Sequence, residues 1–455
     1  MNGSLALVWL VFTGVGVGAF VVPARPAHWP RAAWFALAAL MGLLLIATLA
    51  NALGVYGVPR AVVQIYAYGA AALGWFPWCR RARAPAVVPR REDWGMVLAV
   101  AFLTFVPWAA ALSGPAFVHD AASIWYFKIL DILGNVTPTP EEIAAGWPTH
   151  AHALYPRGLA WLAVLGDPAG TADPSIPRVV SLLFPTMGSL VLGGWFLARR
   201  RFGLGLLAVV LCLSIPESAV QMAIGMADLP LAFALLVTVI GLAFARGADP
   251  NFSDRSAVRF GRLAAAIGAA GAASIKQEGA VIAGAVALYL IVGIVRGPRG
   301  DRWHWALCLA VIATLLPWWN LRSHGDPEVL ADAELATNPI FLSGRVALLT
   351  KKLFYQMFDP AQLDPLGGPP THAPIVSWVL ALGLMFLLLF RRRPVPIWPA
   401  LCLLAADIAV YVITIHDLTW HILTSADRLW MQLTPALIFA VFAAAAAATE
   451  PRTPS

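Results

Sequence analysis

Residues 228–245 read DLPLAFALLVTVIGLAFA, eighteen residues in which Asp228, at the first position, is the only charged side chain. About 20 mostly apolar residues carry an α-helix across the hydrocarbon core of a bilayer. This stretch therefore predicts a membrane-spanning helix that begins with a carboxylate at one membrane surface. Similar stretches recur at residues 4–22, 33–53, 61–78, 95–113, 176–198, 203–220, 262–276, 279–295, 304–320, 374–390, 396–414 and 429–447. We expect an all-α polytopic membrane protein with about 13 transmembrane helices.

Composition supports this fold class. Of the 455 residues, 60% are hydrophobic and 12% are charged, whereas soluble globular proteins carry about 25% charged residues. So few charges cannot cover the surface of a water-soluble fold of this length. The composition excludes cytosolic enzymes, nucleic-acid-binding proteins and secreted disulfide scaffolds. The four cysteines form no CxxC motif, which is typical of buried apolar thiols.

Arginine is concentrated in alternate connections between the predicted spans. These connections include residues 25–31, 80–91, 199–201, 246–262, 296–302 and 391–393. Cytoplasmic loops carry an excess of Lys and Arg, so we expect these connections in the cytoplasm, together with the tail at 448–455. The N-terminus then lies outside. Residues 4–22 have no basic segment before them and no A-x-A site after them, which favours a membrane span over a signal peptide.

Two long connections, about 114–175 and 321–373, fall on the predicted exterior side. The first opens with His119-Asp120, and Trp125, Ile129 and Ile132 then recur at helical spacing, which predicts an interfacial helix that also contains Lys128. Asp120 at its start also fits an N-cap. The second loop ends in a basic amphipathic stretch flanked by Lys351. Such a helix either attracts anionic lipid head groups or anchors the loop.

The first loop continues with His150-Ala151-His152 and then Tyr155-Pro156-Arg157. Two histidines in an H-x-H pattern are able to ligate a metal ion, but polar loop histidines are more common. We therefore predict no metal site here.

Ionisable residues also mark the exterior ends of several predicted spans. They are Asp228, the turn Lys276-Gln277-Glu278-Gly279, and Asp427-Arg428 before the last span. Charges at membrane depth usually pair with one another or serve function. Lys276 and Glu278 could pair only with each other, and Asp427-Arg428 could be an interfacial anchor. Since all these residues share one predicted side, we favour a common exterior pocket that also includes Asp120.

An exterior membrane site has no nucleotide donor, and the chain has no Walker-type phosphate loop. A group transfer at this face needs a donor that is already activated and dissolved in the bilayer, such as a polyprenyl-phosphate-linked sugar. Transfer then needs a carboxylate base for the acceptor hydroxyl and cations for the departing phosphate. This chemistry requires no cofactor; a divalent metal ion is compatible with it but is not predicted.

The order and sidedness of these motifs resemble the GT-C superfamily of membrane glycosyltransferases, which use polyprenyl-phosphate sugars. The similarity is greatest to the bacterial mannosyltransferase and aminoarabinose transferase-like branch. It rests on Asp120-x4-Trp125-x2-Lys128, Tyr155-Pro156, Asp228, Lys276-Gln277-Glu278-Gly279 and Asp427-Arg428. It covers about residues 95–447, which would form the catalytic module, and residues 1–94 would add three N-terminal helices and a basic loop. Arg157 replaces the second proline that the family usually has after Tyr-Pro.

The resemblance implies an inverting hexosyl or pentosyl transferase in the bacterial inner membrane, with its active site on the periplasmic side. Its partners would be the lipid-linked donor, surrounding lipid, and an envelope glycan, glycolipid or protein acceptor, but no nucleic acid. Asp120 would be the catalytic base and Asp228 a second catalytic carboxylate that places the acceptor or tunes Asp120. The donor phosphate would be bound by Lys276, Arg428, Arg157 and Lys351, and the substrates by His119, Lys128, Tyr155 and Glu278.

Two other functions fit parts of the pattern. An O-antigen-ligase or polymerase-like transferase would use a polyprenyl-diphosphate donor and depend on arginine and histidine in the exterior loops. A lipid or polysaccharide transporter would place ionisable groups within its spans, and Asp407 lies in the middle of the predicted span 396–414.

Overall fold

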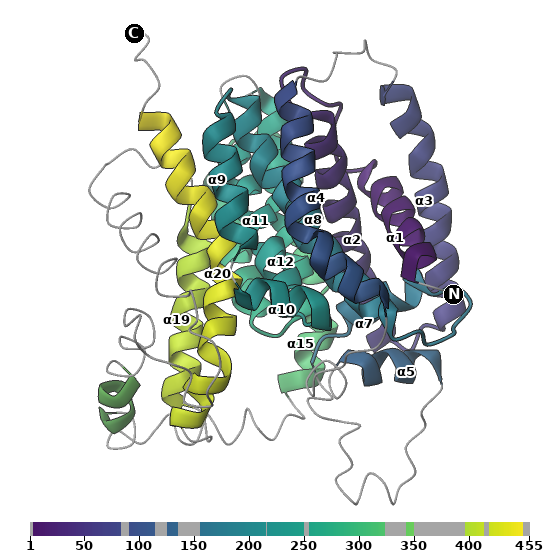
Figure 1. Cartoon of the computed structure of the whole chain (residues 1–455). Helices are drawn as coiled ribbons and strands as arrows, with labels where there is room; N and C mark the ends of the chain where they lie inside the picture. The colour runs from purple at the N-terminus through teal and green to yellow at the C-terminus, as the bar shows by residue number, and fades with distance from the viewer. Residues whose placement is uncertain are drawn as a thin grey trace, which may run out of the picture.

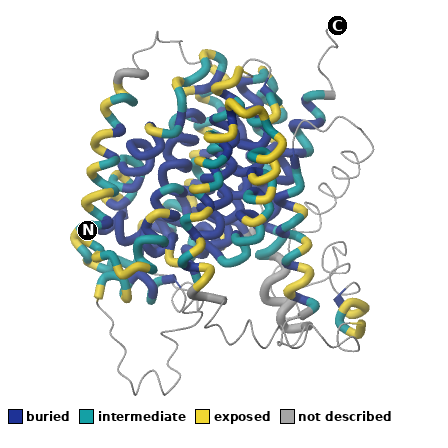
Figure 2. Tube along the Cα trace, turned by 180° about the vertical axis from the view of Figure 1, so that it is seen from behind, coloured by how far each residue is buried: buried dark blue, intermediate teal, exposed yellow. Residues whose placement is uncertain are grey.

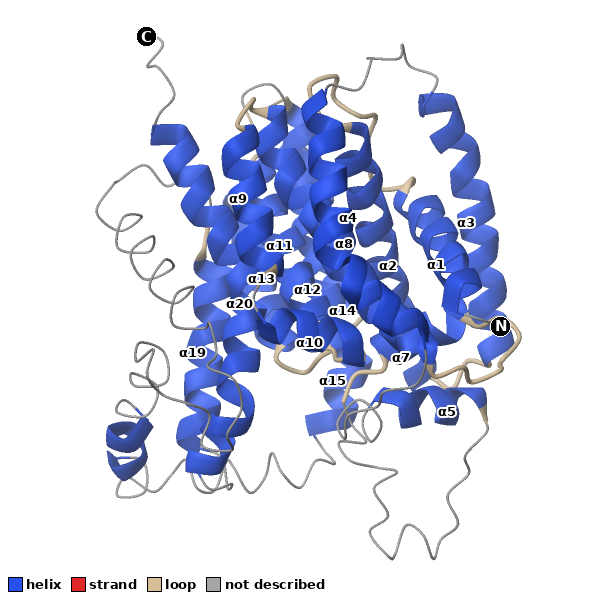
Figure 3. Cartoon of the chain, in the orientation of Figure 1, coloured by secondary structure: helices blue, strands red, loops and turns tan. Residues whose placement is uncertain are grey.

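The chain forms a bundle of α-helices in the computed structural model, which describes residues 3–82, 91–113, 125–134, 155–214, 216–249, 254–323, 343–349, 396–413 and 418–448. No strand occurs among these residues (Figure 3). The elements are α1 (Gly3–Gly18), α2 (Arg31–Val55), α3 (Arg60–Ala82), α4 (Arg91–Ser113), α5 (Phe127–Leu133), α7 (Gly158–Gly166), α8 (Ser175–Ala198), α9 (Phe202–Leu213), α10 (Pro216–Ile224), α11 (Asp228–Ala245), α12 (Arg255–Ile275), α13 (Gly279–Arg296), the 3-10 turn η3 (Arg299–Asp301), α14 (Arg302–Ala313), α15 (Leu316–Ser323), α19 (Trp398–Ile413) and α20 (Leu418–Ala448).

Six stretches of these helices are long and apolar enough to cross a membrane. They are Arg31–Val55, Arg91–Ser113, Ser175–Ala198, Asp228–Ala245, Gly279–Arg296 and Arg428–Ala447. The outward faces of α3 and α4 carry exposed apolar side chains, among them Ile65, Phe102 and Phe105, and exposed positions lie on the outside of the bundle (Figure 2). An all-α, multi-pass membrane protein is confirmed at this level, but a count of 13 transmembrane helices is not.

Two of the predicted spans are broken in the structure. The stretch 203–220 becomes α9 and α10, and 304–320 becomes α14 and α15; α10 has nine residues and α15 has eight. Proline explains both breaks, because Pro216 and Pro317 lack the backbone N–H that would continue the preceding helix. Neither run is therefore one continuous spanning helix, and the predicted span 374–390 lies outside the described residues.

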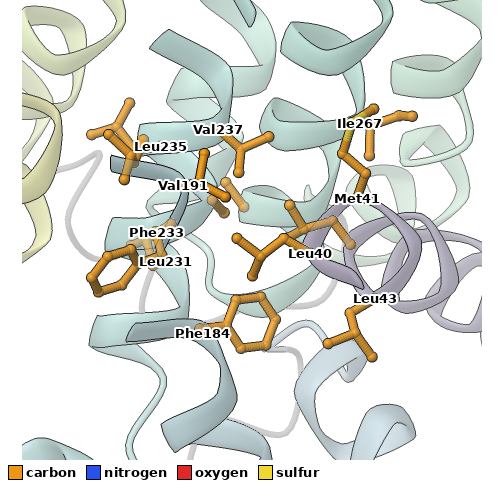
Figure 4. Close-up of a cluster of buried hydrophobic side chains, with 14 of the residues drawn as sticks. Leu40, Met41, Leu43, Phe184, Val191, Leu231, Phe233, Leu235, Val237 and Ile267 are labelled. Atoms are coloured by element: carbon orange, nitrogen blue, oxygen red, sulfur yellow. The ribbon is translucent and has the colours of Figure 1, made fainter. Parts of the chain in front are cut away.

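The core lies where α2, α8, α11 and α12 meet. Figure 4 shows side chains from these four helices in contact, including Leu40, Phe184, Phe233 and Ile267. Helices in lipid associate through close packing rather than through the hydrophobic effect, and small residues permit close approach. The Ala/Gly-rich helix α12 packs closely against α11 in this way. A Cβ atom added at Gly268 would lie only 2.7 Å from the backbone nitrogen of Thr238, so the two backbones leave no room for a side chain there.

This contact between α11 and α12 sets which residues lie side by side. A Cβ added at Gly241 would lie 2.5 Å from the Ala265 nitrogen. With Gly268 opposite Thr238, the two helices are antiparallel. The same register continued to the start of α11 places Asp228 opposite the turn that follows Ile275. Packing of small residues thus brings the carboxylate and the Lys276 turn to one end of the bundle.

The opposite end of the bundle gathers the arginine-rich connections. Asp301 accepts hydrogen bonds from Arg255 and Arg259 at 2.9 and 2.7 Å. Asp249 lies 3.1 Å from both the His28 and Trp29 side chains. In Figure 1 this end is uppermost, and α5, α7, α10 and α15 lie toward the lower end. The arginine-rich connections among the described residues therefore share one end; which end faces the cytoplasm stays a prediction.

The seam between α1 and its neighbours gives a test of the fold. A Cβ at Gly42 of α2 would overlap the carbonyl of Gly14 in α1, whereas one at Gly69 of α3 would meet no atom within 4 Å. We expect Gly42→Ala to lower the stability by about 1–3 kcal/mol, because overpacking forces the two backbones apart. Gly69→Ala, the matched control, should leave the stability unchanged or slightly raised. The unfolding temperature of each variant in detergent measures both effects. Equal unfolding temperatures would contradict the close contact between Gly42 and Gly14.

Candidate functional site

Asp228 is the centre of a buried polar network at the start of α11. Its side chain has no solvent exposure. Its Oδ1 accepts hydrogen bonds from Lys276 Nζ at 2.8 Å and Gln432 Nε2 at 2.7 Å. Its Oδ2 accepts a hydrogen bond from Arg428 Nε at 3.2 Å and lies 3.1 Å from Arg428 Nη2. Both oxygens of this carboxylate are therefore paired with donors from the α12–α13 turn and from α20.

Lys276 lies between two carboxylates. It follows the last residue of α12, and the three residues 276–278 connect α12 to α13. Its Nζ lies 2.6 Å from Glu278 Oε1 in addition to its contact with Asp228. A Cβ at Gly279 would overlap the backbone of Ala272, so this tight turn needs glycine there. The side chain of Lys276 is 8% exposed, and the turn holds the ammonium inside the network.

Arg428 and Gln432 reach the network from α20. They are four residues apart, so they lie on one face of the helix. Gln432 is fully buried, while the Arg428 side chain is 23% exposed. Arg428 is therefore the cation with the greater access to a ligand. The two carboxylates, Asp228 and Glu278, balance the two cations, Lys276 and Arg428.

The residues that precede and begin α7, in the first of the two long predicted loops, are tied to the same turn. Gln277 Nε2 donates to the Tyr155 hydroxyl at 2.7 Å. The backbone N–H of Arg157 donates to Asn51 Oδ1 at 2.8 Å, and the Arg157 guanidinium pairs with Asp131 of α5 at 2.7 Å. These bonds place the start of α7 and the helix α5 beside the Asp228 network.

Lys128 of α5 lies against two aromatic rings of the same predicted loop. Its Nζ is 5.7 Å from the ring centroid of Tyr155 and 6.0 Å from that of Trp125, within the range of a cation–π interaction. Burial, with a further contribution from the positive charge of Arg157, lowers the pKa of Lys128 to about 7. The amine therefore titrates near neutral pH.

The predicted site residues have three outcomes. Asp228, Lys276, Glu278 and Arg428 are joined in one network. Tyr155 is attached to it through Gln277, and Lys128 and Arg157 lie beside Tyr155 rather than in direct contact with Asp228. His119, Asp120, Lys351 and the side chain of Asp427 lie outside the described residues. The catalytic and binding roles of all these residues stay predictions.

Sequence reasoning missed two members of the site, Gln432 and Gln277. Gln432 is a neutral residue within an apolar span, and the available signal was its spacing of one helical turn from Arg428. Gln277 was identified only as part of the turn motif. Among the residues with described positions, no three His, Cys, Asp or Glu side chains are grouped to hold a metal ion; His150 and His152 are not among them.

Comparisons with protein-family models, curated proteins and solved structures find no match to this chain. The resemblance to the GT-C superfamily therefore rests on the order and sidedness of the motifs alone.

The pairing of Asp228 predicts a large stability effect. Asp228→Ala leaves Lys276 and Arg428 without their shared carboxylate, and breaking a buried ion pair from one side costs about 3–5 kcal/mol. Asp254→Ala is the control, because Asp254 is an exposed carboxylate with only local hydrogen bonds, from Ala257 N at 2.8 Å and from the Ser256 hydroxyl. Denaturation in detergent should show a much larger loss of unfolding free energy for Asp228→Ala than for Asp254→Ala. Similar losses in the two variants would contradict the buried network.

Lys128 predicts a pH dependence of stability. Its pKa is about 7 in the folded chain against an ordinary value of 10.5, so the unfolded chain binds more protons between these values. The free energy of unfolding should then rise as the pH increases from 7 toward 10.5. Below pH 7 the Lys128 amine is charged in the folded chain, so the full cost of burying that charge is present. We expect Lys128→Met to flatten this rise in unfolding temperature measured from pH 6.5 to 9.5. A variant that follows the wild-type curve would show that Lys128 is not the titrating group.

Proposed function

We propose that this chain is an inverting membrane glycosyltransferase that moves a sugar from a polyprenyl-phosphate donor to a lipid, glycan or protein acceptor at the exterior face. The observation that carries the proposal is the network of Asp228, Lys276, Glu278 and Arg428, which joins three separate segments. The network lies at the end of the bundle away from the arginine-rich connections (Figure 1). Gln277, between Lys276 and Glu278, donates a hydrogen bond to Tyr155, which belongs to the same predicted loop as Asp120.

In this proposal Asp120 acts as the general base. Its carboxylate takes the proton of the acceptor hydroxyl while that oxygen forms a bond to the anomeric carbon of the donor. The bond from the anomeric carbon to the phosphate oxygen breaks, and its electron pair leaves with the phosphate. A single displacement of this kind inverts the anomeric centre.

The cations would differ in their roles. Arg428 is the more exposed of the two and suits direct contact with the departing phosphate, since a guanidinium binds phosphate oxygens in a bidentate manner. Lys276 is held by two carboxylates and suits a supporting position behind it. Asp228, whose two oxygens are both paired with donors, suits a positioning role that fixes both cations rather than a role as a second proton acceptor.

A transporter is the second candidate, and one observation favours it. Asp407 is buried within the apolar helix α19, and ionisable groups at membrane depth often mark a substrate path. A transporter would move its lipid or saccharide without forming a covalent product, so product analysis separates the two functions.

The proposal predicts sugar transfer by the purified chain in nanodiscs. Wild type should transfer sugar from at least one member of a panel of polyprenyl-phospho-hexoses and polyprenyl-phospho-pentoses. Asp120→Asn should lower the rate by about 10²–10⁴-fold, the usual contribution of a general base. Asp173→Asn, the matched control, changes a carboxylate in the same loop that bonds locally to Ser175, and should keep activity. Full transfer activity in Asp120→Asn would refute the role of Asp120 as general base. The absence of sugar transfer by wild type would refute the proposed glycosyltransferase activity.

A further inference from the structure

A group of arginines at the end of the bundle opposite the Asp228 network takes no part in the proposed mechanism. Arg255, Arg259 and Arg262 recur at i, i+4 and i+7, so they share one face of α12. Asp301 Oδ1 accepts hydrogen bonds from Arg255 Nη2 at 2.9 Å and from Arg259 Nη2 at 2.7 Å. Arg262 Nη1 lies 3.5 Å from Asp301 Oδ2. These contacts hold three cationic groups around one carboxylate, and we call the four residues the Asp301 cluster.

The carboxylate of Asp301 balances only part of this positive charge. Three arginines against one aspartate leave a net charge of +2 on the Asp301 cluster. Further exposed arginines, Arg296, Arg299 and Arg302, lie at the end of α13 and around the turn η3. Among the described residues of these elements at this end, the other carboxylate is the exposed Asp254, which caps α12. Like charges held this close repel one another, so this surface favours a bound anion.

Two arginines of the Asp301 cluster are accessible to a ligand. The side chains of Arg255 and Arg259 are 62% and 39% exposed. Arg262 lies beneath them, with its guanidinium carbon 3.9 Å from the centre of the Trp305 ring. Arg255 uses Nε and Nη2 toward Asp301, and a guanidinium carries about five N–H donors. Arg255 is therefore able to bind Asp301 and a second anion at the same time.

The same surface borders an apolar face that suits contact with lipid. Leu288 and Val295 of α13 and Leu307 of α14 are exposed, and exposed apolar surface of this kind marks contact with a membrane. Trp303, which follows Arg302, is 81% exposed. Tryptophan is enriched where lipid head groups meet the hydrocarbon, so Trp303 indicates that the neighbouring arginines lie at the level of the head groups.

The combination of charge and apolar surface selects the kind of ligand. A guanidinium binds phosphate oxygens in a bidentate manner, and basic residues beside membrane helices attract anionic head groups. A soluble phosphate would leave the adjoining apolar face uncovered, whereas acyl chains cover it. We propose that Arg255 and Arg259, with Arg302 and Trp303 beside them, form a binding site for the head group of an anionic phospholipid. This site is separate from the proposed donor site and does not depend on sugar transfer.

Lipid titrations test the site. The full chain in detergent is titrated with phosphatidylglycerol and with phosphatidylcholine of the same acyl chains, and bound lipid is counted by native mass spectrometry. Wild type should bind phosphatidylglycerol more tightly, with a preference that falls as salt screens the exposed charges. Arg255→Gln and Arg302→Gln should each weaken that binding about fivefold, the usual contribution of one arginine at a membrane surface. Arg31→Gln, which removes an exposed arginine at the start of α2, is the matched control and should bind as wild type does.

A soluble anion separates a lipid site from a general phosphate site. Inorganic phosphate in excess should not displace phosphatidylglycerol from wild type. Trp303→Ala should weaken binding of phosphatidylglycerol, while Trp94→Ala, a change of an exposed tryptophan on α4, should not. Displacement by inorganic phosphate, equal binding of the two phospholipids by wild type, or equal binding by the cluster variants and Arg31→Gln would overturn the proposal.

Unfolding temperatures in phosphatidylcholine separate lost binding from lost folding. Arg255→Gln leaves Asp301 paired with Arg259 and Arg262, so its unfolding temperature should stay close to that of wild type. If Arg255→Gln unfolds, Arg302→Gln decides the question, because Arg302 is not among the three arginines paired with Asp301. Wild-type binding of phosphatidylglycerol by a folded Arg302→Gln variant would then refute the site.

Discussion

The pairing of one fully buried carboxylate with two cations and an amide organises this end of the molecule. Asp228 binds Lys276 from the α12–α13 turn and both Arg428 and Gln432 from α20. Burial of a charge is tolerated only when partners of good geometry surround it. Because those partners come from separate segments, the position of α20 against α11 and the conformation of the turn both depend on Asp228.

The two ends of the bundle use buried carboxylates in different ways. At the arginine-rich end, Asp301 is surrounded by Arg255, Arg259 and Arg262, and the hydrogen bonds from Arg259 and Arg255 hold its pKa well below the usual range. That carboxylate ties α12 to the turn before α14. At the Asp228 end the cations are also paired, and the buried atoms without a partner among the described residues include acceptors of Glu278 and Gln432. At the arginine-rich end they are donors, Arg262 Nε and Trp305 Nε1.

Sidedness predicted that four of the charged residues meet, although it predicted the same for Lys128 and Arg157, which do not contact Asp228. Asp228, Lys276, Glu278 and Arg428 were expected at one membrane surface because each lies at the end of an apolar run, and membrane thickness fixes the height of such ends. The breaks between α9 and α10 and between α14 and α15 were missed, because hydropathy averages over a single proline. Gln432 and Asp407 could not be assigned from the sequence, since the face of a helix that is apolar on all sides is decided by its neighbours. Roles that depend on Asp120 were predicted from motif order alone.

The three-residue turn between α12 and α13 has a mechanical consequence. Its consecutive side chains bind different elements: Lys276 binds α11, and Gln277 binds Tyr155, which precedes α7. Because these two residues are adjacent in a turn of three residues, a substitution that changes the backbone of the turn alters both contacts at once.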